Sequence, residues 1–293
     1  MSDSEALIRI KHLYKIFGLR PEKKLSLVIE GIDKQELLEE HHHVLGLSDI
    51  NLEIPKGSLQ VVMGLSGSGK STLIRHVNRL IEPTAGEIWV GVDDVLKMDK
   101  VQLREFRRYR TAMVFQRFAL LPHRTVLENV AYGLDIQGIA KEEAHQRAER
   151  WIERVGLVGY EQHFPAKLSG GMQQRVGLAR ALATDADILL MDEAFSALDP
   201  LIRTDMQNIL LDLQEELHKT IIFITHDLDE ALKLGDQIAI LRDGGMVQQG
   251  TAQQIVMKPA DDYIMDFVRD INRARVLRVR GVCLLYTSDA ADE

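Results

Sequence analysis

The hydrophobic and polar positions along the chain divide into short apolar runs, which favour strands, and longer periodic stretches, which favour helices. Apolar runs at residues 6–14, 47–54, 58–63, 186–193 and 220–227 predict five β-strands. The last two runs end in acidic residues or histidine. Because the ligands of an open parallel sheet gather at the carboxyl ends of its strands, these ends are candidate positions for a site.

Three longer stretches have the features of helices. Residues 99–109 are rich in arginine, residues 142–157 are amphipathic, and residues 199–217 begin with an aspartate cap followed by proline. The first stretch contains most of a basic run, Arg104, Arg107, Arg108 and Arg110. We interpret them as a solvated helix face, with contact to a membrane partner or to anionic lipid as the alternative.

A charged stretch, residues 19–47, separates the first two predicted strands. Asp33 and Glu36 have the spacing of a capping box, which predicts a short amphipathic helix. The residues expected on its apolar stripe are Leu37, Leu38, Val44 and Leu45. Three successive histidines, residues 41–43, point in different directions on a helix, so they are not expected to converge on one metal ion.

Composition and charge narrow the function classes. The 293 residues are 45% hydrophobic, enough for one large domain or two modest ones. With 36 basic and 44 acidic residues the net charge is -8, which argues against nucleic acid as the main partner. One cysteine excludes an internal disulfide, and no apolar run approaches the roughly 20 residues that span a bilayer. We therefore expect a cytoplasmic protein that reaches a membrane only through a partner.

A phosphate-binding loop is predicted directly after the strand at 58–63. The sequence GLSGSGKS at residues 64–71 fits the pattern G-x-x-x-x-G-K-[ST] and precedes a helical stretch. An incidental glycine-rich turn is the alternative, but the flanking strand and helix favour the phosphate loop. Its lysine is expected to reach the outer phosphates and its last serine to bind magnesium. The residues predicted to contact the nucleotide are Gly64, Ser66, Gly67, Ser68, Gly69, Lys70, Ser71 and Thr72.

The segment ILLMDE predicts the second half of that site. Asp192 ends an apolar strand, where its carboxylate is placed to hold magnesium through water, and Glu193 follows as the residue that orients or deprotonates an attacking water. Solvent-facing acids at a strand end are the alternative when no phosphate loop is near. His226 ends another strand, and this position favours contact with the terminal phosphate. A neutral structural histidine is the alternative.

A second glycine motif, KLSGGMQQR at residues 167–175, opens a helix without a lysine to complete a phosphate loop. The set GLSGSGKS, Gln116 in VFQ, LSGGMQQR, ILLMDE, SALD and ITH, in that order, resembles the nucleotide-binding subunit of ATP-binding cassette (ABC) transporters. The resemblance implies that this motif is the family signature, a helix start that binds the terminal phosphate of ATP held by another subunit. Two complete sites would then require two copies of the chain, arranged head to tail.

The resemblance also assigns roles to single residues. It implies that Phe17 stacks on adenine, with a place in the core as the alternative, and that Gln116 senses magnesium and the transmembrane partner. The signature residues are Ser169, Gly170 and Gly171, and Asp199 is expected to couple the two sites of the dimer. Met172 departs from the glutamine that many members carry, but ATP binding is expected to survive because the backbone donors remain.

Longer runs, including LYKIFG, RLIEPTAGEI and VFQRFALLPHRTVLENVAYGL, are similar to the ATPases of glycine betaine/proline importers. This likeness implies ATP and Mg²⁺ as ligands, a separate permease, a substrate-binding protein, and a place on the cytoplasmic face of the inner or plasma membrane. The alternatives are an ABC importer ATPase for another small solute, such as an amino acid or choline, and a non-transport ABC protein.

The expected fold is α/β, a P-loop NTPase of the ABC nucleotide-binding type with a parallel sheet core, a small antiparallel portion and a helical subdomain. The expected ATPase domain covers residues 1–275, with a helical lobe at about 95–167 and a family-type insertion at about 19–47. The last residues, 276–293, resemble the translation of a vector junction, with a genuine divergent terminus as the alternative, and are excluded from the expected fold. A paired sensor module of the CBS type, which members often carry, is expected to be absent.

Overall fold

The computed structural model describes residues 6–116 and 118–269, and its centre is a six-stranded sheet. The strand order is β10-β9-β3-β8-β7-β6. All neighbours in it are parallel except β9 and β10. The strands are β3 (Leu59–Met63), β6 (Thr111–Phe115), β7 (Ile188–Asp192), β8 (Thr220–Thr225), β9 (Gln237–Arg242) and β10 (Gly245–Gly250). The parallel sheet core expected from the sequence is confirmed.

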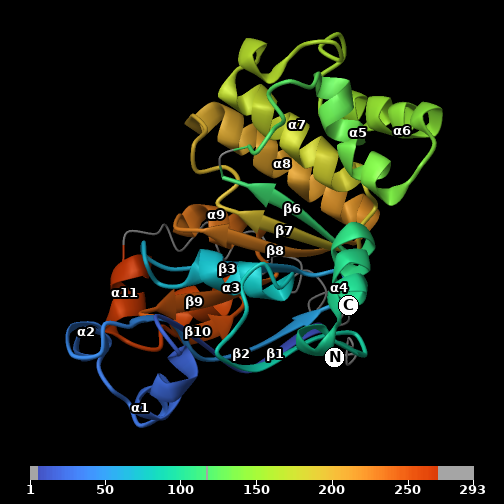
Figure 1. The fold of residues 1–293 in the computed structure, drawn as a ribbon. Helices are drawn as coiled ribbons and strands as arrows, with labels where there is room; N and C mark the ends of the chain where they lie inside the picture. The colour runs from blue at the N-terminus through green and yellow to red at the C-terminus, as the bar shows by residue number, and fades with distance from the viewer. Residues whose placement is uncertain (1–5, 117, 270–293) are drawn as a thin grey trace, which may run out of the picture.

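The central strands are continuous apolar runs because both faces of the sheet are covered. Every residue of β3, β7 and β8 is buried. In β8, Ile221 and Phe223 contribute to one core cluster, whereas Ile222 and Ile224 contribute to the cluster on the opposite face. The helices of these layers are α3 (Lys70–Val77), α8 (Pro200–Leu217), α9 (Leu228–Leu234), α10 (Ala252–Met257) and α11 (Asp262–Val268) (Figure 1).

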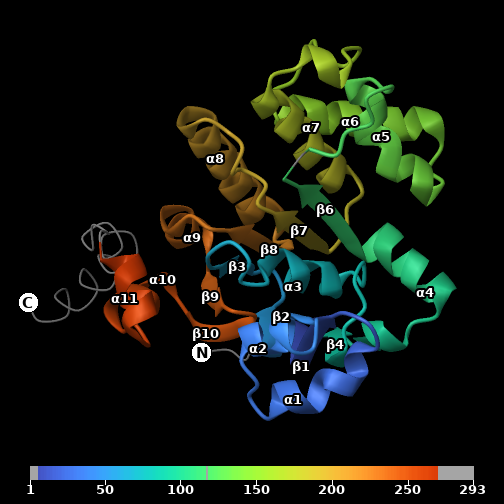
Figure 2. The ribbon, with the colours of Figure 1, turned by 60° about the vertical axis from the view of Figure 1, so that its left-hand side comes forward.

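A smaller antiparallel sheet packs against one of these clusters, as the sequence predicted for the amino-terminal part. Its order is β2-β1-β4-β5, with β1 at Ala6–Phe17, β2 at Val44–Pro55, β4 at Ala85–Val90 and β5 at Asp93–Asp94. Figure 2 shows this sheet below the parallel sheet, with β1, β2 and β4 gathered near α3. The phosphate-loop helix is therefore enclosed between two sheets.

The insertion between β1 and β2 differs from its expected form. It forms two short helices, α1 (Leu25–Ile29) and α2 (Lys34–Glu39), and the side chain of Asp33 caps the second as predicted. The predicted apolar stripe is wrong, because Val44 and Leu45 belong to β2, where they pair with the end of β1. Leu38 is exposed as well, and only Leu37 packs inward from α2. The local periodicity suggested a helix for Val44 and Leu45, but pairing with β1 makes them part of a strand.

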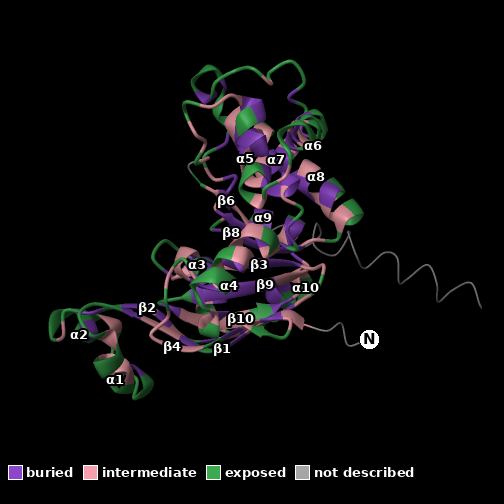
Figure 3. Cartoon of the chain, turned by 45° about the vertical axis from the view of Figure 1, so that its right-hand side comes forward, coloured by how far each residue is buried: buried purple, intermediate pink, exposed green. Residues whose placement is uncertain are grey.

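A separate helical lobe stands above the parallel sheet (Figure 3). Its helices are α5 (Val126–Gln137), α6 (Lys141–Arg154) and α7 (Gly170–Ala183), which bury a cluster of their own. The arginine-rich stretch forms α4 (Lys100–Glu105) and a π-helical turn at Phe106–Arg110. Of its basic residues Arg104 is exposed, but Arg107 is not a freely solvated side chain: it donates to the carbonyl oxygens of Asn78 and Arg79 just after α3.

The residues expected to be atypical, 276–293 with Cys283, lie outside the described residues. Within the described ranges, none of the helices combines the length and the apolar character needed to cross a bilayer.

Asn129, fully buried in α5, holds together the loop that leads into the lobe. Its side chain accepts from the backbone N–H of Leu121 and donates to the carbonyl oxygens of Leu121, Arg124 and Thr125. We expect Asn129→Ala to lower the free energy of unfolding by about 2 to 3 kcal/mol, because these buried backbone groups lose their partner. Ile136→Ala, on the exposed side of α5, should change it by less than about 0.5 kcal/mol. Urea denaturation measures both, and equal effects would contradict the prediction.

Candidate active site

The loop at residues 64–71 joins β3 to α3 and has the backbone that a phosphate-binding loop needs. Gly64 and Gly69 adopt φ values of 149° and 101°. A Cβ at Gly64 would lie 2.2 Å from the carbonyl oxygen of Leu241, and one at Gly69 would lie 2.6 Å from that of Gly46. Glycine is therefore required at both positions by the close approach of neighbouring backbone.

The remaining loop residues are placed where an anion would meet them. Ser66 and Gly67 are exposed, whereas Ser68 is buried. The Ser68 hydroxyl has no hydrogen-bond partner within the described part of the chain. A buried hydroxyl without a partner carries a free-energy cost that a ligand oxygen would remove. The loop therefore fits a phosphate group by a criterion independent of its sequence pattern.

Lys70 begins α3 and points its ammonium back into the loop. Its Nζ donates to the carbonyl oxygens of Gly64 and Leu65 at 2.8 and 2.9 Å. The side chain is almost fully buried, and this burial lowers the pKa of Lys70, while the carboxylates of Glu193 and Asp192 act in the opposite direction. The Lys70 ammonium is thus held by two backbone carbonyl oxygens of its own loop and lies near two acids.

Ser71 and Asp192 meet although 121 positions separate them in the sequence. The Ser71 hydroxyl donates to Oδ1 of Asp192 at 2.7 Å, and Asp192 is buried at the end of β7. A hydroxyl and a carboxylate oxygen in contact are a suitable donor set for Mg²⁺, which prefers oxygen ligands. The structure thus brings together the two residues that the sequence assigned to one magnesium site.

Arg75 is a site residue that the sequence reasoning missed. Its Nη2 donates to Oδ2 of Asp192 at 3.0 Å, so both carboxylate oxygens of Asp192 have a partner. Arg75 lies one helical turn after Ser71 on α3, and residues four apart on a helix share a face. The spacing of Ser71 and Arg75 was visible in the sequence. It indicates a shared contact with Asp192 only once α3 is known to lie beside β7.

Glu193, Gln116 and His226 converge at the carboxyl edge of the parallel sheet. Nε2 of Gln116 donates to Oε2 of Glu193 at 3.1 Å, and Nδ1 of His226 lies 3.5 Å from the same oxygen. Gln116 also donates to the hydroxyl of Ser196, a second residue that the sequence reasoning missed. Glu193 has a left-handed backbone with φ of 47°, a strained conformation for a residue without glycine's freedom.

These groups together supply the parts that phosphoryl transfer to water requires. Lys70 and the loop amides are placed for phosphate charge, and Ser71 with Asp192 for a divalent cation. Oε1 of Glu193 lies 4.0 Å from Nζ of Lys70. A carboxylate so close to the Lys70 ammonium is placed to accept a proton from an attacking water.

Phe17 is not a core residue. It lies at the end of β1 with 39% of its surface exposed, and the ammonium of Lys15 is 4.9 Å from the centre of its ring. The ring rests against Gly46 of β2, where a Cβ would come within 2.6 Å of Phe17 Cε2. An exposed aromatic face beside the phosphate loop is available for stacking with a base.

The signature residues lie on a different part of the chain from the phosphate loop. Ser169 caps α7 by accepting a hydrogen bond from the backbone N–H of Met172, and Gly170 and Gly171 form the first turn. Among the described residues, no hydrogen bond joins this turn to the phosphate loop. Asp199 in turn caps α8. Figure 2 shows α7 in the helical lobe, whereas α3 lies beside the sheet.

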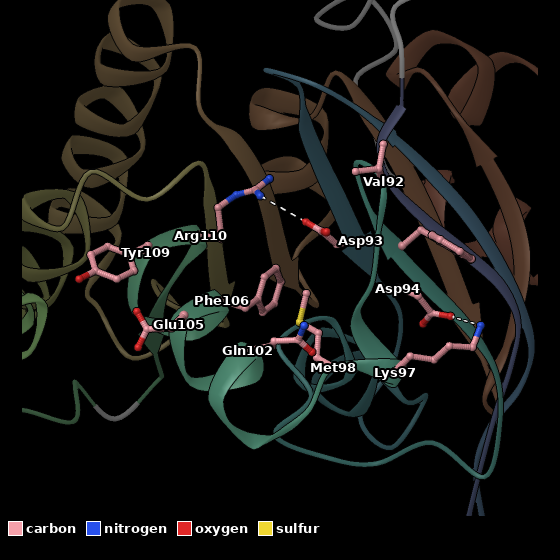
Figure 4. Close-up of a pocket in the computed structure, with 11 residues that line it drawn as sticks. Val92, Asp93, Asp94, Lys97, Met98, Gln102, Glu105, Phe106, Tyr109 and Arg110 are labelled. Carbon is pink, nitrogen blue, oxygen red and sulfur yellow. Dashed lines mark ion pairs between the residues drawn. The ribbon is translucent and has the colours of Figure 1, made fainter.

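A cavity of about 620 Å³ lies outside this constellation (Figure 4). It is lined by β4, β5 and the arginine-rich helix, with ion pairs between Arg110 and Asp93 and between Lys97 and Asp94 at its edge. None of its lining residues belongs to the phosphate loop, the strand ends or the signature turn. We therefore locate the candidate active site from its chemical groups and not from the volume of this cavity.

Comparisons with known proteins show the family that this chain is similar to. A family profile described as ABC transporter matches residues 47–196. The glycine betaine transport ATP-binding protein OpuAA of Bacillus subtilis is 54% identical over 270 residues, which cover 92% of this chain and 65% of OpuAA. The glycine betaine/proline betaine transport system ATP-binding protein ProV of Escherichia coli is 50% identical over 94% of this chain and 69% of ProV. The chain thus spans about two thirds of the length of these curated relatives.

A solved structure described as the dimeric post-hydrolysis state of the ATP-binding cassette MJ0796, bound to ADP and Pi, is similar in fold. The TM-score is 0.71 at 32% identity, and the match covers 84% of this chain and 98% of that chain.

The position of Lys70 leads to a binding prediction. Lys70→Ala should weaken ATP affinity roughly 10- to 100-fold, because a charge-assisted contact to the outer phosphates is lost. The exposed Lys56 serves as a matched control, and Lys56→Ala should bind ATP as the parent does. Isothermal titration calorimetry measures both constants. Equal affinities for Lys70→Ala and the parent would remove Lys70 from the phosphate site.

Proposed function

The chain belongs to the ABC transporter family of ATP-binding proteins, and from this premise we propose that it hydrolyses ATP to drive uptake of glycine betaine or a related betaine through a separate permease. The observation that carries the hydrolytic role is the meeting of Glu193, Gln116 and His226 beside Lys70. The solute is proposed from the likeness to OpuAA and ProV, whose names specify betaines.

In the proposed reaction the loop amides and Lys70 bind the phosphates of ATP. Ser71 and Asp192 hold Mg²⁺, which when bound neutralises phosphate charge and orients the terminal phosphate. The Glu193 carboxylate accepts a proton from the attacking water, and His226 contacts the terminal phosphate. The amide of Gln116 lies at the same oxygen of Glu193 and so fixes the direction of that carboxylate.

Base recognition is proposed for Phe17, whose ring stacks on adenine. The exposure of this ring at the end of β1, where it rests against Gly46 of β2, supports the proposal.

The active unit is proposed to be a head-to-tail dimer. Ser169, Gly170 and Gly171 then bind the terminal phosphate of ATP held by the second copy, through helix-terminal N–H groups. Their separation from the phosphate loop within one chain supports this arrangement. Asp199, at the cap of α8, is proposed to couple the two sites across the dimer interface. The dimeric ATP-binding cassette with a similar fold supports the same proposal.

Contact with the permease is proposed for a groove of about 370 Å³ between the sheet and the helical lobe. Its lining includes Phe115, Leu121 and Arg180, and Phe115 is the residue before Gln116. Arg180 donates to the carbonyl oxygens of Phe118 and Ala119. A residue that lines the groove is therefore hydrogen-bonded to the backbone shortly after Gln116. This contact would hold the subunit at the cytoplasmic face of the membrane, with a substrate-binding protein acting on the other side.

The transport proposal is tested by uptake into vesicles. The chain is to be assembled with the permease and the substrate-binding protein of a glycine betaine importer, and ATP enclosed within the vesicles. We expect uptake of labelled glycine betaine that requires ATP and is competed by proline betaine. Uptake of choline or an amino acid in place of betaines would change the proposed solute. Absence of any ATP-dependent uptake would overturn the transport proposal.

The role of Glu193 is tested by Glu193→Gln. This variant should bind ATP with the parent's affinity but turn over roughly 100- to 10,000-fold more slowly, the range expected when a general base is removed. Phosphate release measures turnover. Parent-like turnover would exclude Glu193 as the base.

The dimer is tested in the Glu193→Gln background, where ATP persists. We expect this variant to sediment as a dimer with ATP and as a monomer without it, because a ligand held by two subunits stabilises the two-chain state. Adding Gly170→Asp should abolish the dimer through repulsion of the phosphate while ATP still binds the monomer.

Gly170 is preferred to Gly171 for this change. A Cβ at Gly170 has only an ordinary 3.6 Å contact with Phe118, whereas one at Gly171 would approach Ile202 to 2.6 Å and disturb the fold. Normal dimerisation of the Gly170→Asp double variant would contradict a phosphate contact between subunits.

A further inference from the structure

Glu230 is a buried carboxylate that the proposed reaction does not use. Among the described residues, Asp192 and Glu230 are the two acidic residues that are buried. Asp192 belongs to the active site, whereas Glu230 lies in the first turn of α9, just after His226. A carboxylate is costly to bury unless it is well hydrogen-bonded, so its partners indicate what it is for.

Glu230 is hydrogen-bonded to the residue before His226 and to a residue of α8. One carboxylate oxygen accepts from the Thr225 hydroxyl at 2.5 Å, and the other accepts from Nε2 of Gln207 in α8 at 3.0 Å. The same Thr225 hydroxyl accepts from the backbone N–H of Asp227 at 3.0 Å. The carboxylate therefore fixes, through one hydroxyl, the residue before His226 and the residue after it.

A second connection joins this loop to α8. Asp227 accepts from the backbone N–H of Glu230, and its other oxygen is 3.3 Å from Nη1 of Arg203. Arg203 also donates to the carbonyl oxygen of Leu198, in the turn before α8. Burial raises the pKa of Glu230, since it disfavours the charged form, while the bonds from Thr225 and Gln207 favour that form.

His226 itself has no comparable support from its own side chain. More than half of its side chain is exposed, and its ring nitrogen Nδ1 lies 3.5 Å from Glu193. The place of the ring relative to Glu193 thus depends on the backbone from Thr225 to Asp227. The groups that determine this backbone are the hydroxyl and carboxylates just described.

We propose that Glu230 is a positioning residue for ATP hydrolysis, which locks the loop Thr225–Asp227 onto α8 and thereby sets the position of His226 opposite Glu193. This inference rests on the proposed ATPase function. Glu230 contacts neither the phosphate loop nor Ser71 through any hydrogen bond in the described part of the chain. Its loss therefore affects turnover and leaves ATP binding in place.

The first test compares three substitutions by steady-state kinetics. Glu230→Ala should lower kcat roughly 10- to 100-fold with KM for ATP changed less than about threefold, because a displaced catalytic group loses alignment. Glu230→Gln keeps one acceptor oxygen for the Thr225 hydroxyl but loses the second, which accepts from Gln207, and should therefore recover only part of the loss. Asp229→Ala, an exposed acid in the same helical turn, is the matched control and should behave as the parent.

Thr225→Val covers the case in which Glu230→Ala does not fold. Valine matches the buried shape of threonine but removes the hydroxyl that links Glu230 to the Asp227 backbone. The same split, a fall in kcat at nearly constant KM, is expected. Parent-like kcat in folded Thr225→Val or Glu230→Ala would overturn the inference.

A double-mutant cycle tests whether Glu230 acts through His226. If it does, Glu230→Ala combined with His226→Ala should be no slower than His226→Ala alone, since the group being positioned is already absent. Multiplied effects would mean that Glu230 acts elsewhere, and the inference would fail while the ATPase function stood.

A spectroscopic readout keeps the two proposals separate. The imidazole signals of His226, one of 10 histidines, are assigned in a ¹³C–¹H NMR spectrum by their loss in His226→Ala. They should shift in Glu230→Ala and Thr225→Val and remain unchanged in Asp229→Ala. Absence of ATP hydrolysis by the parent would contradict the proposed function, whereas unchanged His226 signals would contradict the positioning role.

Discussion

The register of the parallel strands is the constraint on which the candidate site depends. Met63 pairs with Thr225, Asp192 with Ile224, and Phe115 with Asp192, so the carboxyl ends of β3, β8, β7 and β6 lie in nearly one row. The residues that follow these ends are Gly64, His226, Glu193 and Gln116. Because side chains alternate along a strand, a shift of one residue would turn Asp192 away from Ser71 and bring apolar side chains to the edge. The buried apolar faces of the sheet prevent that shift.

Buried charge at this edge is supported by hydrogen bonds at each position. Lys70 is held by two carbonyl oxygens of its own loop, and Asp192 by a hydroxyl and a guanidinium. Glu230 is held by a hydroxyl and an amide. An isolated buried charge would cost several kcal/mol, so each set of partners is a condition for the fold as well as for the chemistry. This free-energy cost explains why few charged residues are buried in the described part of the chain.

α8 connects features that lie far apart in the sequence. Its cap is Asp199, its first turn places Ile202 against Gly171 of the signature helix, and Arg203 reaches Asp227 beside His226. The first turn of α8 thus contacts both the start of α7, where the signature residues lie, and the loop that carries His226. For a dimer in which the signature of one copy serves the nucleotide of the other, this turn is a rigid connection between the two surfaces.

The sequence by itself determined the parts whose cause is local. It predicted the central strands, the caps at Asp33 and Asp199, and the glycine loop between β3 and α3, and it assigned Ser71 and Asp192 to one magnesium site. It did not identify Arg75, Ser196 or Glu230, and it assigned Val44 to a helix. These depend on which strand lies beside which: Val44 is in β2 because β1 offers it hydrogen bonds, and Arg75 reaches Asp192 because α3 lies beside β7. Local patterns encode backbone preference and burial, whereas contacts across more than 100 residues are decided by strand order and packing.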